Sequence, residues 1–351
     1  MHQSVILLFY TAISFLVSFL FFPVFIKLLR QWKVFDESGG HKIHLAFTPS
    51  MGGLSIFLGA IVTLLICLSL QQWIALKFFF VSIALMFFIG LRDDILALSA
   101  RQKLYSQLLP IAILIILGQT MVRSTYGLVW DQSLPMWAAV VLTAFIFVIL
   151  TNAYNLIDGL DGLAGTVGVL ILSFFGGWFF AVGDVVLSYI AFAFVGGLLS
   201  FLFFNWQPAK IFMGDTGTLM IGFLISFLAL TFIDRNYSLP HEHPFKFSSS
   251  IGTAVCILII PVFDTCRVII LRLRKFQSPF QADRNHVHHQ FLNLGFSHSR
   301  TVVCMAAINM FFVGLAVVLK KFSDWWTLGS AVAICLIINF ALRRAQSRAA
   351  V

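Results

Sequence analysis

Charged residues are scarce in this chain. Only 11% of its 351 residues are charged and 60% are apolar, whereas about a quarter of the residues of a soluble protein are charged. Apolar runs of about 20 residues recur, and this length crosses a bilayer as a helix. No polar stretch is long enough for a separate soluble domain. The sequence therefore predicts an all-α polytopic membrane protein, with residues 1–351 forming a single integral membrane domain.

Cysteine motifs, a signal peptide and internal repeats are also missing. The five cysteines lie in or beside apolar runs without Cys-x-x-Cys spacing, so we expect neither disulfides nor a cysteine metal site. The N-terminus has no cationic segment, and the first apolar run is too long for a signal peptide. We expect that run to remain in the protein as a membrane span.

Eleven spans are predicted from the apolar runs, and alternate connections then fall on opposite sides of the membrane. Of the 23 lysines and arginines, seventeen lie on one side and six on the other. Because basic residues concentrate in cytoplasmic loops, we expect the N-terminus outside and the C-terminus in the cytoplasm. This placement indicates a membrane protein with no nucleic-acid partner. The predicted spans are 4–29, 50–70, 74–91, 104–122, 136–156, 162–182, 184–204, 216–233, 249–271, 301–319 and 325–342.

This topology gathers five polar loops on the cytoplasmic side, near 30–49, 92–103, 152–165, 205–217 and 272–300. In the third loop, Asn152, Asn155, Asp158 and Asp161 recur every third residue, so their side chains would share one slowly drifting face if the segment is helical. Carboxylates are costly in hydrocarbon, so acids at the mouth of a membrane helix suggest function. The alternative is a helix cap followed by an Asx-turn.

Five aspartates on this side suggest a bound cation: Asp93, Asp94, Asp158, Asp161 and Asp215. An oxygen-rich site suits Mg²⁺, which takes one or two protein ligands and leaves other positions to phosphates and water. The histidine spacing does not fit a closed zinc site, and the third loop lacks the ligand pattern of a calcium-binding loop. Taken alone, the first two aspartates could equally be a solvated helix end.

The fifth loop adds donors for phosphate oxygens, namely Arg284, His286, His288 and His289. Gly214-Asp-Thr-Gly217 opens a helix whose N-terminus can support an anion, although taken alone it is more often a turn and a cap. The histidines alone could form an ordinary polar loop. Acids, a metal and basic donors on one membrane face together favour phosphoryl transfer with one phosphate anchored in the bilayer.

The combined motifs resemble the polyprenyl-phosphate N-acetylhexosamine-1-phosphate transferases. They are Asp93-Asp94, Asn152-xx-Asn155-xx-Asp158-Gly-xx-Gly162, Phe212-Met-Gly-Asp215-Thr-Gly, and Asp283-Arg284-x-His286-x-His288-His289. That family begins O-antigen, enterobacterial common antigen, teichoic-acid and peptidoglycan synthesis, and the His-x-His-His form is more similar to the branches that use N-acetylglucosamine. The resemblance implies a bacterial inner-membrane enzyme that joins undecaprenyl phosphate to the sugar phosphate of a UDP-N-acetylamino sugar and releases UMP.

The resemblance also implies a role for each residue. Asn155 and Asp215 look like ligands of Mg²⁺ or Mn²⁺. Asp93 and Asp94 are similar to the pair assigned to the lipid phosphate, and Lys42 and Lys103 to basic positions near the phosphates. Arg284 and the three histidines resemble the nucleotide-sugar loop, and the aspartates Asp158 and Asp161 match motif acids whose role is less settled.

Several alternatives stay open at the level of the sequence. A lipid phosphate has its second pKa near 6 and is already mostly dianionic, so we favour an orienting role for Asp93 or Asp94 over base catalysis. A covalent aspartyl-phosphate, another UDP-linked donor such as a deoxy sugar or MurNAc-pentapeptide, and a homo-oligomer are all compatible with the residues. A secondary transporter would place its ionisable groups near the bilayer midplane, and here the acids lie at span ends.

Overall fold

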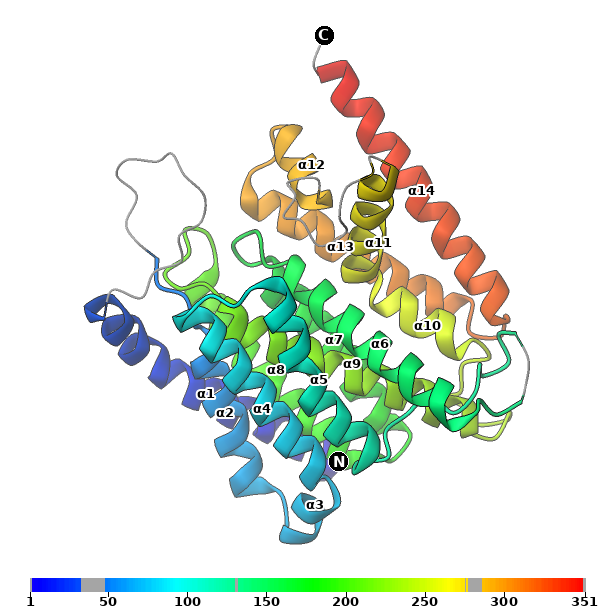
Figure 1. The fold of residues 1–351 in the computed structure, drawn as a ribbon, viewed down its shortest axis with the longest axis horizontal. Coiled ribbons are helices and arrows are strands. Elements are labelled where there is room, and N and C mark those ends of the chain that lie inside the picture. The colour runs from blue at the N-terminus through cyan, green and yellow to red at the C-terminus, as the bar shows by residue number, and fades with distance from the viewer. Residues whose placement is uncertain (1, 33–47, 130–131, 275, 277–285, 350–351) are drawn as a thin grey trace.

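Helices account for all the regular secondary structure that the computed structural model describes, in residues 2–32, 48–129, 132–274, 276 and 286–349 (Figure 1). Within these ranges the one extended pairing is an isolated bridge between Ser124 and Ser133. The helices are α1 (His2–Gln31), α2 (Gly53–Cys67), α3 (Leu70–Ala75), α4 (Lys77–Ile95), α5 (Ala100–Ile116), α6 (Met136–Leu156), α7 (Leu163–Ala181), α8 (Val185–Asn205), α9 (Gly214–Ser238), α10 (Ser250–Ile257), α11 (Ile259–Arg274), α12 (Val287–Asn293), α13 (His298–Val318) and α14 (Asp324–Ala349).

Seven of these helices are long and apolar enough to cross a membrane, namely α1, α6, α7, α8, α9, α13 and α14. The pair α10–α11 is an eighth candidate if it counts as one span. The expectation of an all-α, multi-pass membrane protein is therefore confirmed. The other three predicted spans coincide with α2, α4 and α5, but α2 has only 15 residues, α5 has 17, and α4 carries four charges. The count of eleven and the orientation of the termini stay predictions.

Helix α9 is the centre of the bundle (Figure 1). Helices α4, α6, α2 and α7 pack around it, while α1 packs on α8 and α2. In the most apolar 18-residue stretch of α9, 89% of the residues are buried. In the corresponding stretch of the peripheral α14 only 17% are buried. The N-terminus of α9, which carries the Gly-Asp-Thr-Gly motif, is therefore held among the ends of the surrounding helices.

The segment that opens with Asn152 is not one continuous helix. Helix α6 ends at Leu156, and α7 begins only after Gly162, which adopts φ +83°. Asn152 and Asn155 therefore share the last turns of α6, as expected, whereas Asp158 and Asp161 lie in the turn between the helices. The predicted common face stops at Leu156, and the chain enters α7 through Gly162, because glycine adopts a left-handed conformation without strain.

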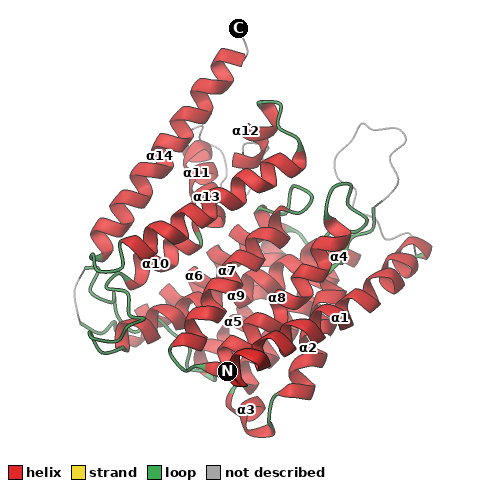
Figure 2. Cartoon of the chain, turned by 180° about the vertical axis from the view of Figure 1, so that it is seen from behind, coloured by secondary structure: helices red, strands yellow, loops and turns green. Residues whose placement is uncertain are grey.

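The predicted ninth span is broken. Helices α10 and α11 meet at an angle of 85°, and Pro261 is the third residue of α11. Proline has no amide hydrogen, so it fits the first turn of a helix, where that hydrogen would have no partner. Figure 2 shows that α10, α11, α13 and α14 lie together, on the side of the bundle away from α1 and α2.

The close packing of α4 on α9 provides a first prediction. A Cβ added at Gly90 would lie 2.3 Å from the backbone oxygen of Asp215, so Gly90→Ala should force the helices apart and cost about 1–3 kcal/mol of stability. Gly177→Ala in α7 is the matched control, because nothing lies within 4 Å of its Cβ position. Thermal unfolding of the detergent-purified variants compares the two. An equal melting temperature for both would contradict the packing.

Candidate active site

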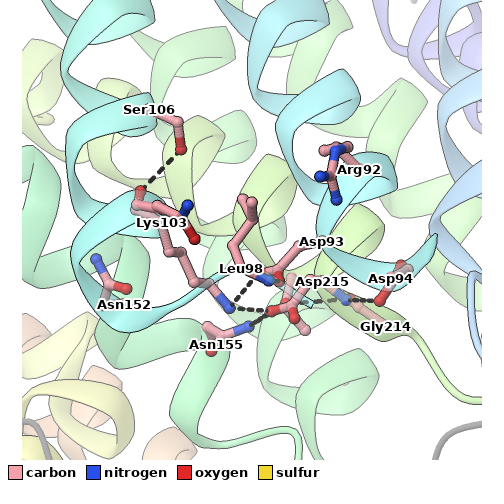
Figure 3. Close-up of polar contacts among 12 residues, drawn as sticks. Arg92, Asp93, Asp94, Leu98, Lys103, Ser106, Asn152, Asn155, Gly214 and Asp215 are labelled. Carbon is pink, nitrogen blue, oxygen red and sulfur yellow. Dashed lines mark hydrogen bonds and ion pairs between the residues drawn. The ribbon is translucent and has the colours of Figure 1, made fainter. Parts of the chain in front are cut away.

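Polar side chains from three predicted loops meet at one end of the bundle. Asp93 lies in the last turn of α4, Asn155 in the last turn of α6, and Asp215 in the first turn of α9 (Figure 3). Lys103, near the start of α5, completes the group. Its Nζ lies 2.5 Å from Asp215 Oδ1 and 3.0 Å from Asp93 Oδ2. One cation thus links two carboxylates that would otherwise repel each other.

Asp94 points away from this cation and supports the backbone of α9. Its Oδ1 accepts a hydrogen bond from the Asp215 amide at 2.8 Å, and its Oδ2 accepts from the amide and hydroxyl of Thr216 at 2.9 and 2.5 Å. A carboxylate at a helix N-terminus satisfies amides that have no partner inside the helix. The adjacent aspartates therefore have different contacts: Asp93 faces Lys103, and Asp94 caps the helix that carries Asp215.

Asn155 joins the cluster through its amide nitrogen. Nδ2 donates to Asp215 Oδ1 at 2.5 Å and to Thr218 Oγ1 at 2.6 Å. One turn earlier, Asn152 accepts from and donates to Gln107 of α5. Thr218 and Gln107 were not identified from the sequence, because an uncharged polar residue within a helix gives no local sign of its partner on another helix.

The predicted first and fourth loops are joined by their backbones. The Gly52 amide donates to the Phe212 oxygen at 2.8 Å, the Gly53 amide to the Met213 oxygen at 3.0 Å, and the Phe212 amide to the Pro49 oxygen at 2.9 Å. These bonds hold the segment that leads into α9 immediately before Asp215.

Asn205 and Asp161 connect the third loop to the fourth. The Asn205 side chain accepts from the Gly162 amide at 2.7 Å and donates to the Ile211 oxygen at 2.8 Å, while Asp161 Oδ2 accepts from the Ala209 amide at 3.2 Å. Asp158 lies in the same turn and also has a polar partner.

The segment with the three histidines lies next to the turn between α6 and α7. His286 precedes α12, and His288 and His289 lie in its first turn. A Cβ added at Gly159, next to Asp158, would lie 2.8 Å from His288 Nε2. The fifth predicted loop is therefore in contact with the third. Lys42 and Arg284 lie outside the described residues, so their predicted proximity to the phosphates is not addressed.

His288 is buried, and its ring has no hydrogen-bond partner among the residues that the structure describes. Its side chain is 1% exposed, and neither ring nitrogen forms a hydrogen bond among the described residues. Burial lowers the pKa of His288 to about 3, and the neighbouring His289 acts in the same direction while Asp264 opposes them. The imidazole is therefore neutral, with one nitrogen able to donate a hydrogen bond and the other able to accept one.

Asp264 is a buried acid that the sequence reasoning missed. It lies in α11, and its side chain accepts hydrogen bonds from His286 Nδ1 and the Val287 amide, both at 2.8 Å. It therefore anchors the start of α12. The available signal was an ionisable residue within the apolar run 249–271, because such residues are rare inside membrane helices and often functional.

The comparisons with known proteins agree with these motifs. Residues 76–233 match the family model described as glycosyl transferase family 4. A probable undecaprenyl-phosphate N-acetylglucosaminyl 1-phosphate transferase of Bacillus subtilis is 32% identical over 90% of this chain and 86% of its own length. The chain belongs to the polyprenyl-phosphate N-acetylhexosamine-1-phosphate transferase family. It is therefore an enzyme that transfers a phospho-sugar.

Two further relatives extend this similarity. An undecaprenyl-phosphate alpha-N-acetylglucosaminyl 1-phosphate transferase of Yersinia pestis is 27% identical over 94% of this chain and 90% of its own length. A decaprenyl-phosphate N-acetylglucosaminephosphotransferase of Mycolicibacterium smegmatis is 29% identical over 85% and 79%. The alignments extend well beyond the five polar loops, so the similarity includes the helices that hold the site.

The anchoring of α12 by Asp264 can be tested without an activity assay. In Asp264→Asn an amide N–H replaces Oδ2 and faces His286 Nδ1, so the charged hydrogen bond is lost. A loss of about 1.5 kcal/mol should make amide hydrogen exchange in α12 about tenfold faster. Hydrogen-exchange mass spectrometry on the purified protein measures this.

The matched control is Asp324→Asn. Asp324 is also a buried acid, and its Oδ1 accepts from Ser249 Oγ at 2.7 Å and the Gly252 amide at 2.6 Å at the start of α10. It should accelerate exchange in α10 and leave α12 unchanged. Faster exchange in α12 for both variants would indicate a general loss of stability, and our assignment to Asp264 would be wrong.

Proposed function

We propose that this enzyme transfers N-acetylglucosamine 1-phosphate from its UDP-sugar to undecaprenyl phosphate, releases UMP and so begins a cell-surface glycan. The observation that carries this proposal is the 32% identity to the Bacillus subtilis relative over 90% of the chain. The product would be a lipid diphosphate sugar, the starting point for polymers such as O-antigen or a cell-wall glycan.

The two substrates approach the site differently. The prenyl chain of undecaprenyl phosphate is anchored in the bilayer. Its phosphate therefore lies at the level of the helix ends, where Asp93 and Lys103 are found. The UDP-sugar is soluble and reaches the exposed loops. The unpartnered nitrogens of buried His288 support a donor-binding role for the histidine segment, because a ligand that enters there provides the missing hydrogen-bond partners.

A divalent cation fits the donor set at Asp215. Carboxylate and amide oxygens are the ligands that Mg²⁺ prefers, and Mn²⁺ accepts the same set. Lys103 and Asn155 occupy Oδ1 of Asp215, which leaves Oδ2 to ligate the ion. Asn155 could ligate the ion through its side-chain oxygen only after rotation of the side-chain amide, because its nitrogen donates to Asp215 Oδ1. The bound ion would supply charge neutralisation for the diphosphate.

The residues of the chain itself address the repulsion between two anionic substrates. Lys103 places a positive charge between Asp93 and Asp215, and its amine can donate hydrogen bonds to a phosphate oxygen. Such alignment and neutralisation supply most of the rate in phosphoryl transfer. The contacts of Asp94 with the α9 backbone support an orienting role for this residue. Asp93 lies 3.0 Å from the Lys103 amine and so can position this cation for the lipid phosphate.

The orientation follows from the basic residues. We place the site on the cytoplasmic face of the bacterial inner membrane, with eleven spans, because UDP-sugars are cytosolic and seventeen of the 23 basic residues fall on that side. A different UDP-N-acetylamino sugar is the nearest alternative. A transporter is disfavoured, because the clustered acids Asp93 and Asp215 lie at the ends of α4 and α9.

A vesicle assay tests the reaction and its side together. Sealed inverted vesicles supplied with undecaprenyl phosphate should release UMP from UDP-N-acetylglucosamine, whereas sealed right-side-out vesicles should not, because the donor does not cross a bilayer. A panel of UDP-linked N-acetylgalactosamine, deoxy sugars and MurNAc-pentapeptide supplies the comparison. Faster release from one of these donors would overturn the sugar assignment, and release only from right-side-out vesicles would overturn the orientation.

The metal assignment predicts a specific loss. Asp215→Asn should weaken Mn²⁺ binding at least tenfold, followed by electron paramagnetic resonance, and lower kcat about 100-fold, equivalent to about 3 kcal/mol of transition-state stabilisation. Asp234→Asn is the control, because it makes the same change near the other end of α9, where Asp234 accepts from the Tyr126 hydroxyl. Equal Mn²⁺ affinity in both variants would exclude Asp215 as a ligand.

A further inference from the structure

A cavity with polar and apolar walls lies at the far end of the bundle from Asp93 and Asp215. It has a volume of about 800 Å³ and is lined by the ends of α3, α4, α5, α8 and α9, with Lys77 and Arg235 among its residues. Lys77 begins α4, and Asp93 lies sixteen residues later on the same helix. At 1.5 Å per residue this separates them by about 24 Å. The cavity is therefore distinct from the active site.

Positive charge predominates in this cavity. Arg235 Nε lies 3.5 Å from Asp184 Oδ2, and both side chains remain partly exposed. Lys77 has no carboxylate partner among the described residues, and its Nζ lies 5.0 Å from the centroid of the Phe78 ring. Two cations and one carboxylate thus line the cavity, so its net charge favours an anion.

The helix directions add to this preference. The first residues of α4 (Lys77 to Phe79) and of α8 (Val185 to Leu187) both line the cavity. Neither helix has a side-chain hydrogen bond to cap its N-terminus. Unpaired amide hydrogens and the positive end of the helix dipole therefore come from two helices to one place, together with Lys77 and Arg235.

Part of the remaining wall is apolar. Phe79 and Leu114 are buried at the cavity, while Ile74 and Leu117 are more than half exposed on its surface. Gln72 and Gln119 contribute side-chain amides on the same lining. A ligand that fits has a compact anionic group and a hydrocarbon portion, which is the chemistry of a phosphate-headed lipid.

We propose that this cavity binds the phosphate head group of a membrane lipid, in the leaflet opposite the active site. The head group contacts Lys77, the Arg235 guanidinium and the free amides of α4 and α8. The first acyl or prenyl carbons lie against Leu117 and Ile74. Asp184 opposes this binding, because its carboxylate is close to the anion and occupies Arg235. The site does not depend on the proposed transfer reaction.

Native mass spectrometry of the purified full chain can measure this binding. The probes are phosphatidylglycerol, undecaprenyl phosphate and inorganic phosphate, each titrated separately. Lys77→Gln and Arg235→Gln should each weaken lipid binding about tenfold, the loss expected from one charge-assisted hydrogen bond. Asp184→Asn should strengthen it several-fold, because Arg235 becomes free. Lys321→Gln is the matched control, since it removes one exposed lysine that does not line the cavity.

The direction in which each variant changes the lipid affinity tests the proposal. Opposite effects of the Lys77 and Asp184 variants, with no effect of Lys321→Gln, support the site. Equal affinities in all four variants would overturn it, as would equal effects of Lys77→Gln and the control. Inorganic phosphate that binds as tightly as the lipids would overturn the lipid assignment. The lipid for which Lys77→Gln has the larger effect identifies the source of the phosphate.

Discussion

Asp94 holds the first turn of α9 from the end of α4, and the arrangement of the polar cluster depends on this contact. Its two oxygens take the amides of Asp215 and Thr216, so the direction in which the Asp215 side chain leaves the helix is set by a neighbouring helix. Gly90 allows the two backbones to approach closely enough. Asp93 then faces Lys103, and Lys103 reaches Asp215. Each later contact follows from the position of α9.

The residues of the site were predictable from the sequence. Acids at the ends of apolar runs are costly, so those that are present are usually functional. Asp93, Asn155 and Asp215 do come together, with Lys103 among them. The division of work between Asp93 and Asp94 was not predictable. Consecutive residues of a helix point about 100° apart, so which one faces the cluster depends on how α4 is rotated against α9. The packing of α4 on α9 fixes that rotation, and it cannot be predicted from the local sequence of α4.

Other features depend on long-range contacts in the same way. Periodicity placed Asp158 and Asp161 on a helical face, but α6 ends at Leu156 because the chain has to turn and let α7 pack against α8. The apolar run 249–271 reads as one span, yet it contains an 85° bend. Asp264 lies beyond that bend, and its contact with His286 joins residues separated by a stretch of charged and polar sequence. Hydropathy identifies the apolar run 249–271, but it does not show that Asp264 within this run contacts His286.

The isolation of His288 has an energetic consequence for the free enzyme. A buried polar group without a hydrogen bond costs about 1–3 kcal/mol, and both ring nitrogens lack partners among the described residues. The rest of the fold holds this imidazole against Gly159 despite that cost. A ligand that forms a hydrogen bond with either nitrogen would remove this cost, which would favour its binding. The position of this side chain therefore prepares the protein for a ligand that can form hydrogen bonds there.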